Sequence, residues 1–185
     1  MQKRSHVLLA RTLLPHMPHA VSRWQRYAFV FGSFQPDCNP FTHLRGSLRH
    51  RWFRGHSFPN AHTYVERHAD RLAGQSRWNL RHYYTLGKLT HYVADAFTLP
   101  HNEAFRQSLA AHHAYERQLR SVFAREAHSF ALRHVGTLAG STAAIVQLHA
   151  QYRSAPSGHE RDAQYILQAN ALLLAACRPA LLQAG

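Results

Sequence analysis

The feature that most constrains the fold is an uninterrupted helical pattern over residues 78–99, which Pro100 follows. Proline lacks the N–H that continues a helix and clashes with the preceding turn, so the helix ends or kinks there. No alternating strand pattern of useful length appears. The 78–99 segment is the longest continuous helical pattern, and further helical patterns cover residues 7–14, 20–30, 61–73, 102–131, 141–152 and 161–182. The sequence therefore predicts an all-α fold, a compact bundle that forms a single domain over residues 1–185.

The second and third predicted helices are separated by residues 31–59, where the helical pattern fails. On helix 20–30, Trp24, Ala28 and Phe29 are expected to make apolar contacts. Residues 31–59 are rich in Gly, Pro, Asn and Ser, and they include the aromatic and basic stretches FTHLRGSLRH and RWFRGH. The segment is too long for a plain connection, so it predicts a long functional loop.

The charge balance points to an anionic partner. Lys and Arg number 22 against nine Asp and Glu, which gives a formal net charge of +13. Such a chain attracts nucleic acid, anionic lipid head groups or phosphate esters. The apolar run 7–14 is interrupted by Arg11 and ends at Pro15, and this is not typical of a signal peptide. No stretch approaches the ~20 apolar residues of a membrane span, so we expect a cytoplasmic location.

The strongest chemical signal is the segment THYVADAFTLPHN. His91 and Asp95 are four residues apart and share one face of a helix. His101 lies just past Pro100, where the turn of the chain can point it back toward the same site. Paired His and Asp side chains on a rigid element are typical metal ligands.

A second His-carboxylate pair follows in AHHAYE, where His112 and Glu116 are again four apart. The adjacent His113 points about 100° away on a helix, so His112 is the better candidate. One such pair is often only a surface hydrogen bond. Two such pairs with His101 between them are unexpected by chance in a chain with only nine carboxylates, so they favour a metal site. Zinc binds this mixture of N and O ligands.

Other candidates lie nearer the N-terminus. Asp37 stands in FGSFQPDCNP, where an ordinary Asx turn is the competing interpretation. His6, His50 and His56 could also supply imidazole, and their spacing alone does not choose among them.

Taken together, these motifs resemble a known family. The pattern His91-x3-Asp95-x5-His101, then His112-x3-Glu116, preceded by Gly-Ser-x-x-Pro-Asp37, resembles the zinc-dependent phospholipase C family, which is related to the S1/P1 nucleases. The resemblance runs from His6 to about Glu116. Beyond that point only the helical character of the chain matches.

The resemblance implies a cluster of two or three zinc ions. The first zinc would be held by Asp37, a loop histidine, His91 and Asp95. We choose His56 as the loop ligand because it directly precedes a helix, with His50 as the alternative. The second zinc would be held by His101, His112 and Glu116. A third would lie between His6, the amino group of Met1 and a bridging Asp95. Asp37 is also the implied general base, and secreted members expose a tryptophan where this chain has Met1.

Three functions are compatible with these residues. The first is metal-assisted hydrolysis of a phosphodiester, with phospholipase C-like cleavage of a phospholipid head group and peripheral contact with a membrane surface. Glu116 favours this function, because the related nucleases tend to have Asp at that position. Apolar loop residues that could enter a lipid surface favour it too, unless they pack on the bundle instead: Phe41, Leu44, Leu48, Trp52 and Phe53. The second is a nuclease or small-phosphoester hydrolase, which the positive charge favours. The third is a basic helical protein that binds nucleic acid or a protein without catalysis. The sequence does not indicate an oligomeric state.

Overall fold

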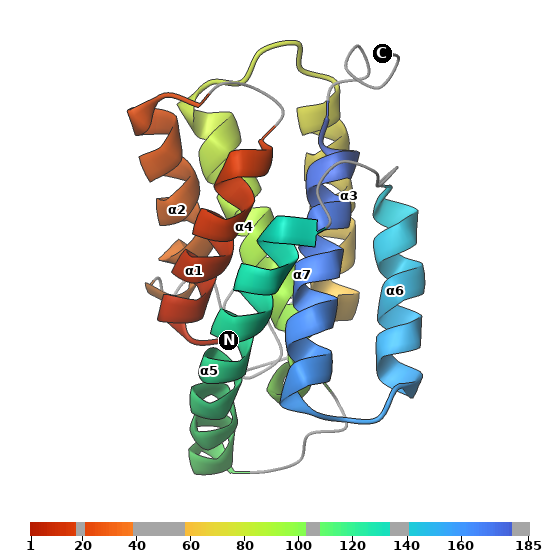
Figure 1. The fold of residues 1–185 in the computed structure, drawn as a ribbon. Helices are drawn as coiled ribbons and strands as arrows, with labels where there is room; N and C mark the ends of the chain where they lie inside the picture. The colour runs from red at the N-terminus through yellow and green to blue at the C-terminus, as the bar shows by residue number, and fades with distance from the viewer. Residues whose placement is uncertain (18–20, 39–57, 103–107, 134–140, 179–185) are drawn as a thin grey trace.

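The chain is built from α-helices. The computed structural model describes residues 1–17, 21–38, 58–102, 108–133 and 141–178, and these contain no strand (Figure 1). The helices are α1 (Lys3–Leu13), α2 (Arg23–Cys38), α3 (Phe58–Ala73), α4 (Leu80–Ala96), α5 (Leu109–Arg133), α6 (Thr142–Ser154) and α7 (His159–Ala176). Two 3-10 helices, η1 (Leu14–His16) and η3 (Leu99–His101), follow α1 and α4. The prediction of an all-α fold is confirmed.

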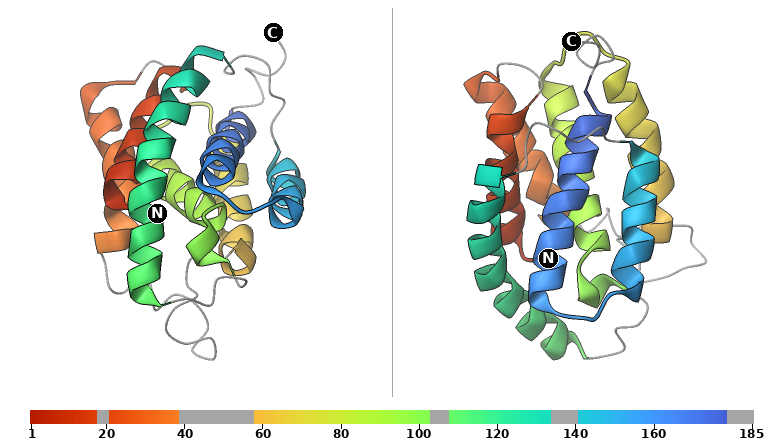
Figure 2. Two further views of the ribbon diagram at one scale, coloured as in Figure 1. Left: turned by 60° about the horizontal axis from the view of Figure 1, so that its bottom comes forward. Right: turned by 45° about the vertical axis from the view of Figure 1, so that its right-hand side comes forward.

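Helix α4 is the centre of the bundle. It contacts α1, α2, α3 and α7, and in the left view of Figure 2 it lies between α2 and α7. Helices α5 and α6 both pack on α7. The side chain of Asn79 caps α4 by accepting a hydrogen bond from the backbone of His82. Because α4 is surrounded, it buries polar as well as apolar side chains, including His91 and Asp95.

Two glycines let α2 approach α4 closely. A Cβ atom on Gly32 would lie 2.3 Å from the backbone oxygen of Tyr84, and one on Gly87 would lie 2.2 Å from the backbone oxygen of Phe29. No side chain fits at either position without moving the backbone. This close crossing brings the C-terminal end of α2 against the middle of α4.

The predicted loop begins later than residue 31. Helix α2 continues to Cys38 and includes Pro36, so Asp37 lies on a helix and not in a loop or an isolated Asx turn. The reason is tertiary packing: Gly32, Ser33 and Pro36 form a buried face of α2, and burial outweighs the low helix propensity of these residues. The loop prediction is also wrong at its end, because Phe58 and Pro59 begin α3. The rest of it falls on residues 39–57, which are outside the described part of the chain, together with the apolar residues expected to favour membrane contact.

Other boundaries also differ from the prediction. Among the described residues the longest helix is α5, with 25 residues, and not the 78–99 segment, where α4 has 17. Helix α4 begins after its Asn79 cap and ends at Ala96, before Pro100, which lies in η3. The prediction that Trp24 makes apolar contacts in the bundle is wrong, because its side chain is 60% exposed while Phe29 is fully buried. Trp24 points away from the face of α2 that packs on α4.

No described helix is long and apolar enough to cross a membrane. That the whole chain forms one domain stays a prediction.

Candidate metal centre

His91 and Asp95 lie on the buried face of α4, one turn apart. Both are almost completely excluded from solvent. The His91 Nδ1 atom lies 3.0 Å from the Ser33 carbonyl oxygen of α2, and it donates there because a carbonyl can only accept. The other nitrogen, Nε2, is 3.3 Å from Asp95 Oδ2. A histidine whose Nδ1–H is fixed by a carbonyl presents Nε2 as a ligand atom, the arrangement found at many metal sites.

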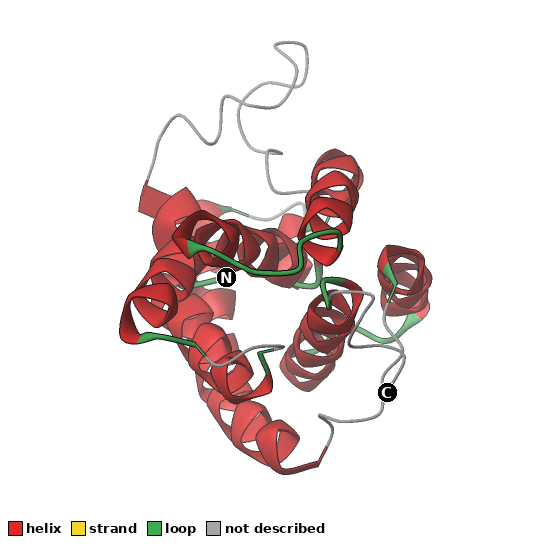
Figure 3. Ribbon diagram, turned by 90° about the horizontal axis from the view of Figure 1, so that it is seen from above, coloured by secondary structure: helices red, strands yellow, loops and turns green. Residues whose placement is uncertain are grey.

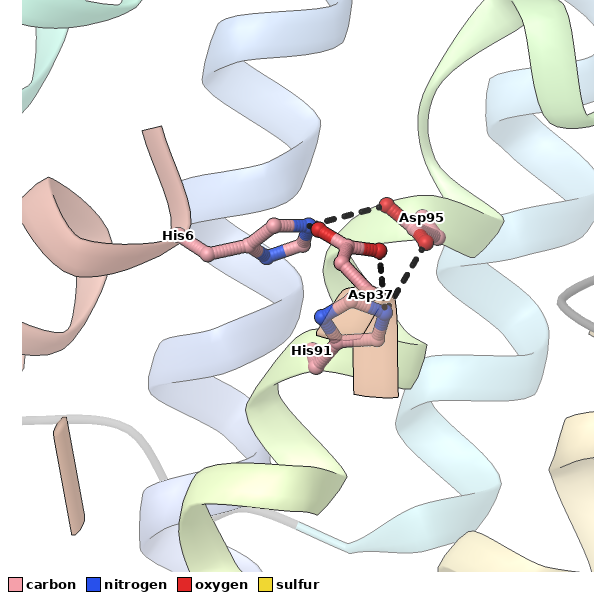
Figure 4. Close-up of side chains that lie close together, drawn as sticks. All are labelled: His6, Asp37, His91 and Asp95. Atoms are coloured by element: carbon pink, nitrogen blue, oxygen red, sulfur yellow. Dashed lines mark ion pairs between the residues drawn. The ribbon is translucent and has the colours of Figure 1, made fainter. Parts of the chain in front are cut away.

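Side chains from three helices form the first ligand group: His6 from α1, Asp37 from α2, and His91 and Asp95 from α4 (Figure 4). One ligand atom of each lies within 4.8 Å of those of the others. His6 Nε2 is 3.3 Å from Asp95 Oδ1, and His91 Nε2 is 3.5 Å from Asp37 Oδ1. Asp37 is the accessible member, with a side chain 30% exposed against 1% for Asp95.

The second ligand group contains His101 from η3 and His112 and Glu116 from α5, again with ligand atoms within 4.8 Å of one another. Glu116 Oε1 lies 3.0 Å from His112 Nε2 and 3.5 Å from His101 Nε2. Pro100 lies in η3, which follows α4 and places His101 beside Glu116 of α5. His113, the rejected neighbour of His112, is exposed.

The amino group of Met1 lies between the two groups. It donates to Asp95 Oδ1 at 2.7 Å, lies 2.9 Å from Glu116 Oε1 and is 3.1 Å from His101 Nε2. Viewed from above, this end of the chain lies within the ring of helices, and Met1 is 4% exposed (Figure 3). Burial lowers the pKa of the amine, but the Asp95 and Glu116 carboxylates outweigh burial and raise that pKa to about 10. The amine therefore occupies, as a cation, the space that joins the two ligand groups.

The imidazoles differ in their protonation. Burial and the neighbouring His91 lower the pKa of His6 to about 3, so His6 is neutral at neutral pH. Burial also lowers the pKa of His101, against the opposing effect of Asp95. For His91 burial is outweighed by the carboxylates of Asp95 and Asp37, and the pKa is raised. Neutral imidazole is the form that binds a metal ion, so His6 and His101 are already in that form.

The buried carboxylates are held ionised. Burial acts to raise the pKa of Asp95, but the Met1 amine and the imidazoles of His101, His91 and His6 hold it well below its usual range. For Glu116 burial is likewise outweighed by hydrogen bonds with His101 and His112, and the pKa is lowered. A buried anion is costly unless it is paired, and here each is surrounded by cations or potential ligands.

A buried carboxylate that sequence analysis missed supports the second group. Asp162, at the start of α7, is completely buried. Its Oδ2 accepts from the Leu99 backbone N–H at 2.7 Å and from the Tyr115 hydroxyl at 2.9 Å. Its Oδ1 accepts from the Tyr152 hydroxyl at 2.9 Å and from Arg161 at 2.8 Å. Asp162 thus connects η3, α5, α6 and α7 through one side chain.

These bonds end next to two candidate ligands. Leu99 is the first residue of η3, two positions before His101, and Tyr115 directly precedes Glu116. Asp162 therefore fixes both segments that present the second ligand group. The scarcity of carboxylates was the only signal in the sequence that could have marked Asp162, because its partners Leu99 and Tyr115 are 63 and 47 residues away.

The structure brings most of the predicted ligands together. Those found in the two groups, or between them, are Met1, His6, Asp37, His91, Asp95, His101, His112 and Glu116. His6 lies with the first group, where its Nε2 and the Met1 amine both approach Asp95 Oδ1. The choice of His56 over His50 falls on residues 39–57 and is outside the described part of the chain.

The comparison with protein-family models settles the class. A model described as zinc dependent phospholipase C matches residues 5–173 of the 185. The chain belongs to the zinc-dependent phospholipase C family. Searches of the curated proteins and of the solved structures gave no significant match. As a member of the phospholipase C family, the protein is a zinc-dependent hydrolase of phosphate esters, and the interpretation as a non-catalytic binding protein is not retained.

The residues present fit zinc. The two groups offer imidazole nitrogens and carboxylate oxygens and no thiolate, a donor set that suits Zn²⁺. Four side-chain donors surround the first position and three the second, and three donors leave room for water or substrate.

Proposed function

We propose that the protein cleaves the head-group phosphodiester of phospholipids at two zinc ions, one in each ligand group. Asp37, His91 and Asp95 would hold the first ion, with His6 or a histidine from residues 39–57 completing its ligands. His101, His112 and Glu116 would hold the second. The observation that carries this proposal is that five separate elements, α1, α2, α4, η3 and α5, converge on two adjacent donor groups that meet at Asp95.

The Met1 amine bears on the number of ions. It occupies the space between Asp95 and Glu116 as a cation. A third ion there would require the amine to lose its proton, so that its nitrogen could become a ligand instead of a charge partner. If a histidine from residues 39–57 completes the first site, then His6, Asp95 and the Met1 nitrogen remain as donors for a third position. We propose two ions, with this third position filled at high zinc concentration.

The chemistry follows from the donor residues. Bound zinc lowers the pKa of water and neutralises charge on a phosphate group. Among the carboxylates of the site, Asp37 is positioned to accept the proton of an attacking water, because it is the one that solvent reaches. Asp95 and Glu116 are buried, ionised and surrounded by imidazole, so their role is to bind and orient.

The test compares substrates and site variants. The zinc-loaded protein is assayed on phosphatidylcholine micelles and on single-stranded DNA, alongside His91→Ala and Asp95→Asn. We expect release of phosphorylated head group by the parent protein and its loss in both variants. Cleavage of DNA with no cleavage of lipid would replace the proposal by the nuclease alternative. Unchanged lipid cleavage in both variants would show that the site is elsewhere.

A further inference from the structure

The outer face of α2 carries a row of exposed aromatic side chains. Trp24 is 60% exposed, Tyr27 66% and Phe31 52%. Their spacing of three and four residues places them on one stripe of the helix. The opposite stripe, which includes Phe29, packs on α1 and α4, and α2 lies at the left edge of the molecule in Figure 1. The exposed stripe is therefore not needed to hold the described helices together.

These side chains form two sets of neighbouring rings along the stripe, and Phe34 and Tyr84 join the second set. Ring centroids are 6.0 Å apart for Trp24 and Tyr27, and Phe31 lies 5.5 Å from Phe34 and 6.0 Å from Tyr84 of α4. We call these five residues the α2 aromatic band. Single exposed apolar residues are common, but a set of exposed aromatic rings on one stripe marks an interaction surface.

Cationic side chains lie beside three of the five rings of the α2 aromatic band. The Arg23 guanidinium lies 5.0 Å from the Trp24 ring, and Lys88 lies 5.6 Å from Tyr84. Lys3 of α1 lies 4.7 Å from the Phe34 ring. Helices α1, α2 and α4 contribute three, two and two Lys or Arg residues, and their two carboxylates, Asp37 and Asp95, both belong to the first ligand group. Around the band the surface is therefore positive.

We propose that the α2 aromatic band docks on an anionic phospholipid surface, an inference that rests on the proposed cleavage of phospholipid. Tryptophan and tyrosine suit the head-group layer because each has an apolar ring with a polar edge. Lys and Arg beside them attract anionic lipid. The band ends at Phe34, one turn before Asp37, so docking would bring the accessible edge of the metal centre toward the surface that contains the substrate.

Binding is tested without turnover. The full chain, freed of zinc with a chelator, is sedimented with vesicles of equal parts phosphatidylglycerol and phosphatidylcholine at physiological ionic strength. We expect Trp24→Ser/Tyr27→Ser/Phe31→Ser to lower the partition coefficient by about tenfold or more, since three rings lose their burial in lipid. Leu109→Ser/Val146→Ser, which replaces exposed apolar residues on α5 and α6, is the matched control and should bind as the parent does. Equal binding by the band variant and the parent would overturn the inference.

A second measurement separates this inference from the proposed function. Hydrolysis is compared on vesicles and on short-chain phosphatidylcholine below its critical micelle concentration. The band variant should lose most activity on vesicles and retain activity on the monomeric lipid. Vesicle binding through the band with no hydrolysis of either lipid would refute the proposed function and leave the inference standing. The inference would be refuted if the band variant hydrolysed both lipids at parent rates. It would also be refuted if the variant bound vesicles as the parent does but had lost binding to a single-stranded oligonucleotide.

Discussion

Replacing Asp162 by asparagine removes the carboxylate that holds together the supports of the second ligand group. Asparagine keeps one of the two oxygens, and its NH2 group cannot accept a hydrogen bond from the donors that faced the other oxygen. If that oxygen takes the place of Oδ1, the Leu99 N–H loses its acceptor and the Tyr115 hydroxyl must rotate. In the other orientation the loss falls on Tyr152 and Arg161.

The structure sets the size of this effect. A hydrogen bond to a charged group contributes about 1.5–3 kcal/mol. The substitution disturbs the two bonds to Oδ2 in one orientation and the three bonds to Oδ1 in the other. The Arg161 guanidinium, which also lies 4.1 Å from the Tyr152 ring, keeps its charge without a carboxylate partner. Removing one member of a buried ion pair costs about 3–5 kcal/mol, and we expect Asp162→Asn to lower the free energy of unfolding by this amount. A domain of this size is stable by about 5–15 kcal/mol, so the variant should still fold.

Two assays distinguish a local from a general effect. Urea unfolding of the zinc-free protein measures the loss of stability, and calorimetric zinc titration measures each binding step. We expect affinity for one zinc to fall about 10–100-fold, because the partners that position metal ligands contribute this much, while the other zinc binds as before. Tyr165→Phe, which removes a hydroxyl on the same helix and keeps the ring packed on Phe97, should change neither. Unchanged unfolding and unchanged titration in Asp162→Asn would refute the reasoning.

Three further predictions follow from single residues. Asp95→Asn should lower the zinc content measured by metal analysis, because this carboxylate contacts both ligand groups. It should also lower kcat by about 100-fold or more. Gly87→Ala should destabilise the protein in urea by about 3 kcal/mol or more, since the new Cβ meets backbone of α2, and should also weaken zinc binding by displacing Asp37. Burial lowers the pKa of His149 from 6.5 to about 4, so the folded protein keeps this imidazole neutral. The free energy of unfolding of the parent should therefore fall by up to about 3 kcal/mol as the pH falls from 6.5 to 4. The loss should be smaller in His149→Leu when unfolding is measured across that range; an equal loss would contradict this assignment.

The ligand-bearing helices could be predicted because their information is local. His91 and Asp95, and His112 and Glu116, lie one helical turn apart, and spacing alone places each pair on one face. The end of the helix before Pro100 is equally local. These local features are sufficient to indicate a zinc site from the sequence.

Other parts of the site depend on contacts between distant segments. Pro36 reads as a helix breaker, and only the packing of Gly32 against α4 shows why α2 continues to Asp37. Spacing cannot bring His6 next to Asp95, because 89 positions separate them, and only the resemblance suggested it. The prediction of apolar contacts for Trp24 failed for a related reason. The apolar character of a side chain does not reveal which face of its helix packs against another helix.

The central claim is that two zinc ions lie in the two ligand groups, and anomalous scattering at the zinc edge from crystals of the zinc-loaded protein tests it most directly. We predict one peak among Asp37, His91 and Asp95 and another among His101, His112 and Glu116, with any third peak beside His6 and the Met1 nitrogen. Peaks at other side chains, or none in protein that is catalytically active, would contradict it.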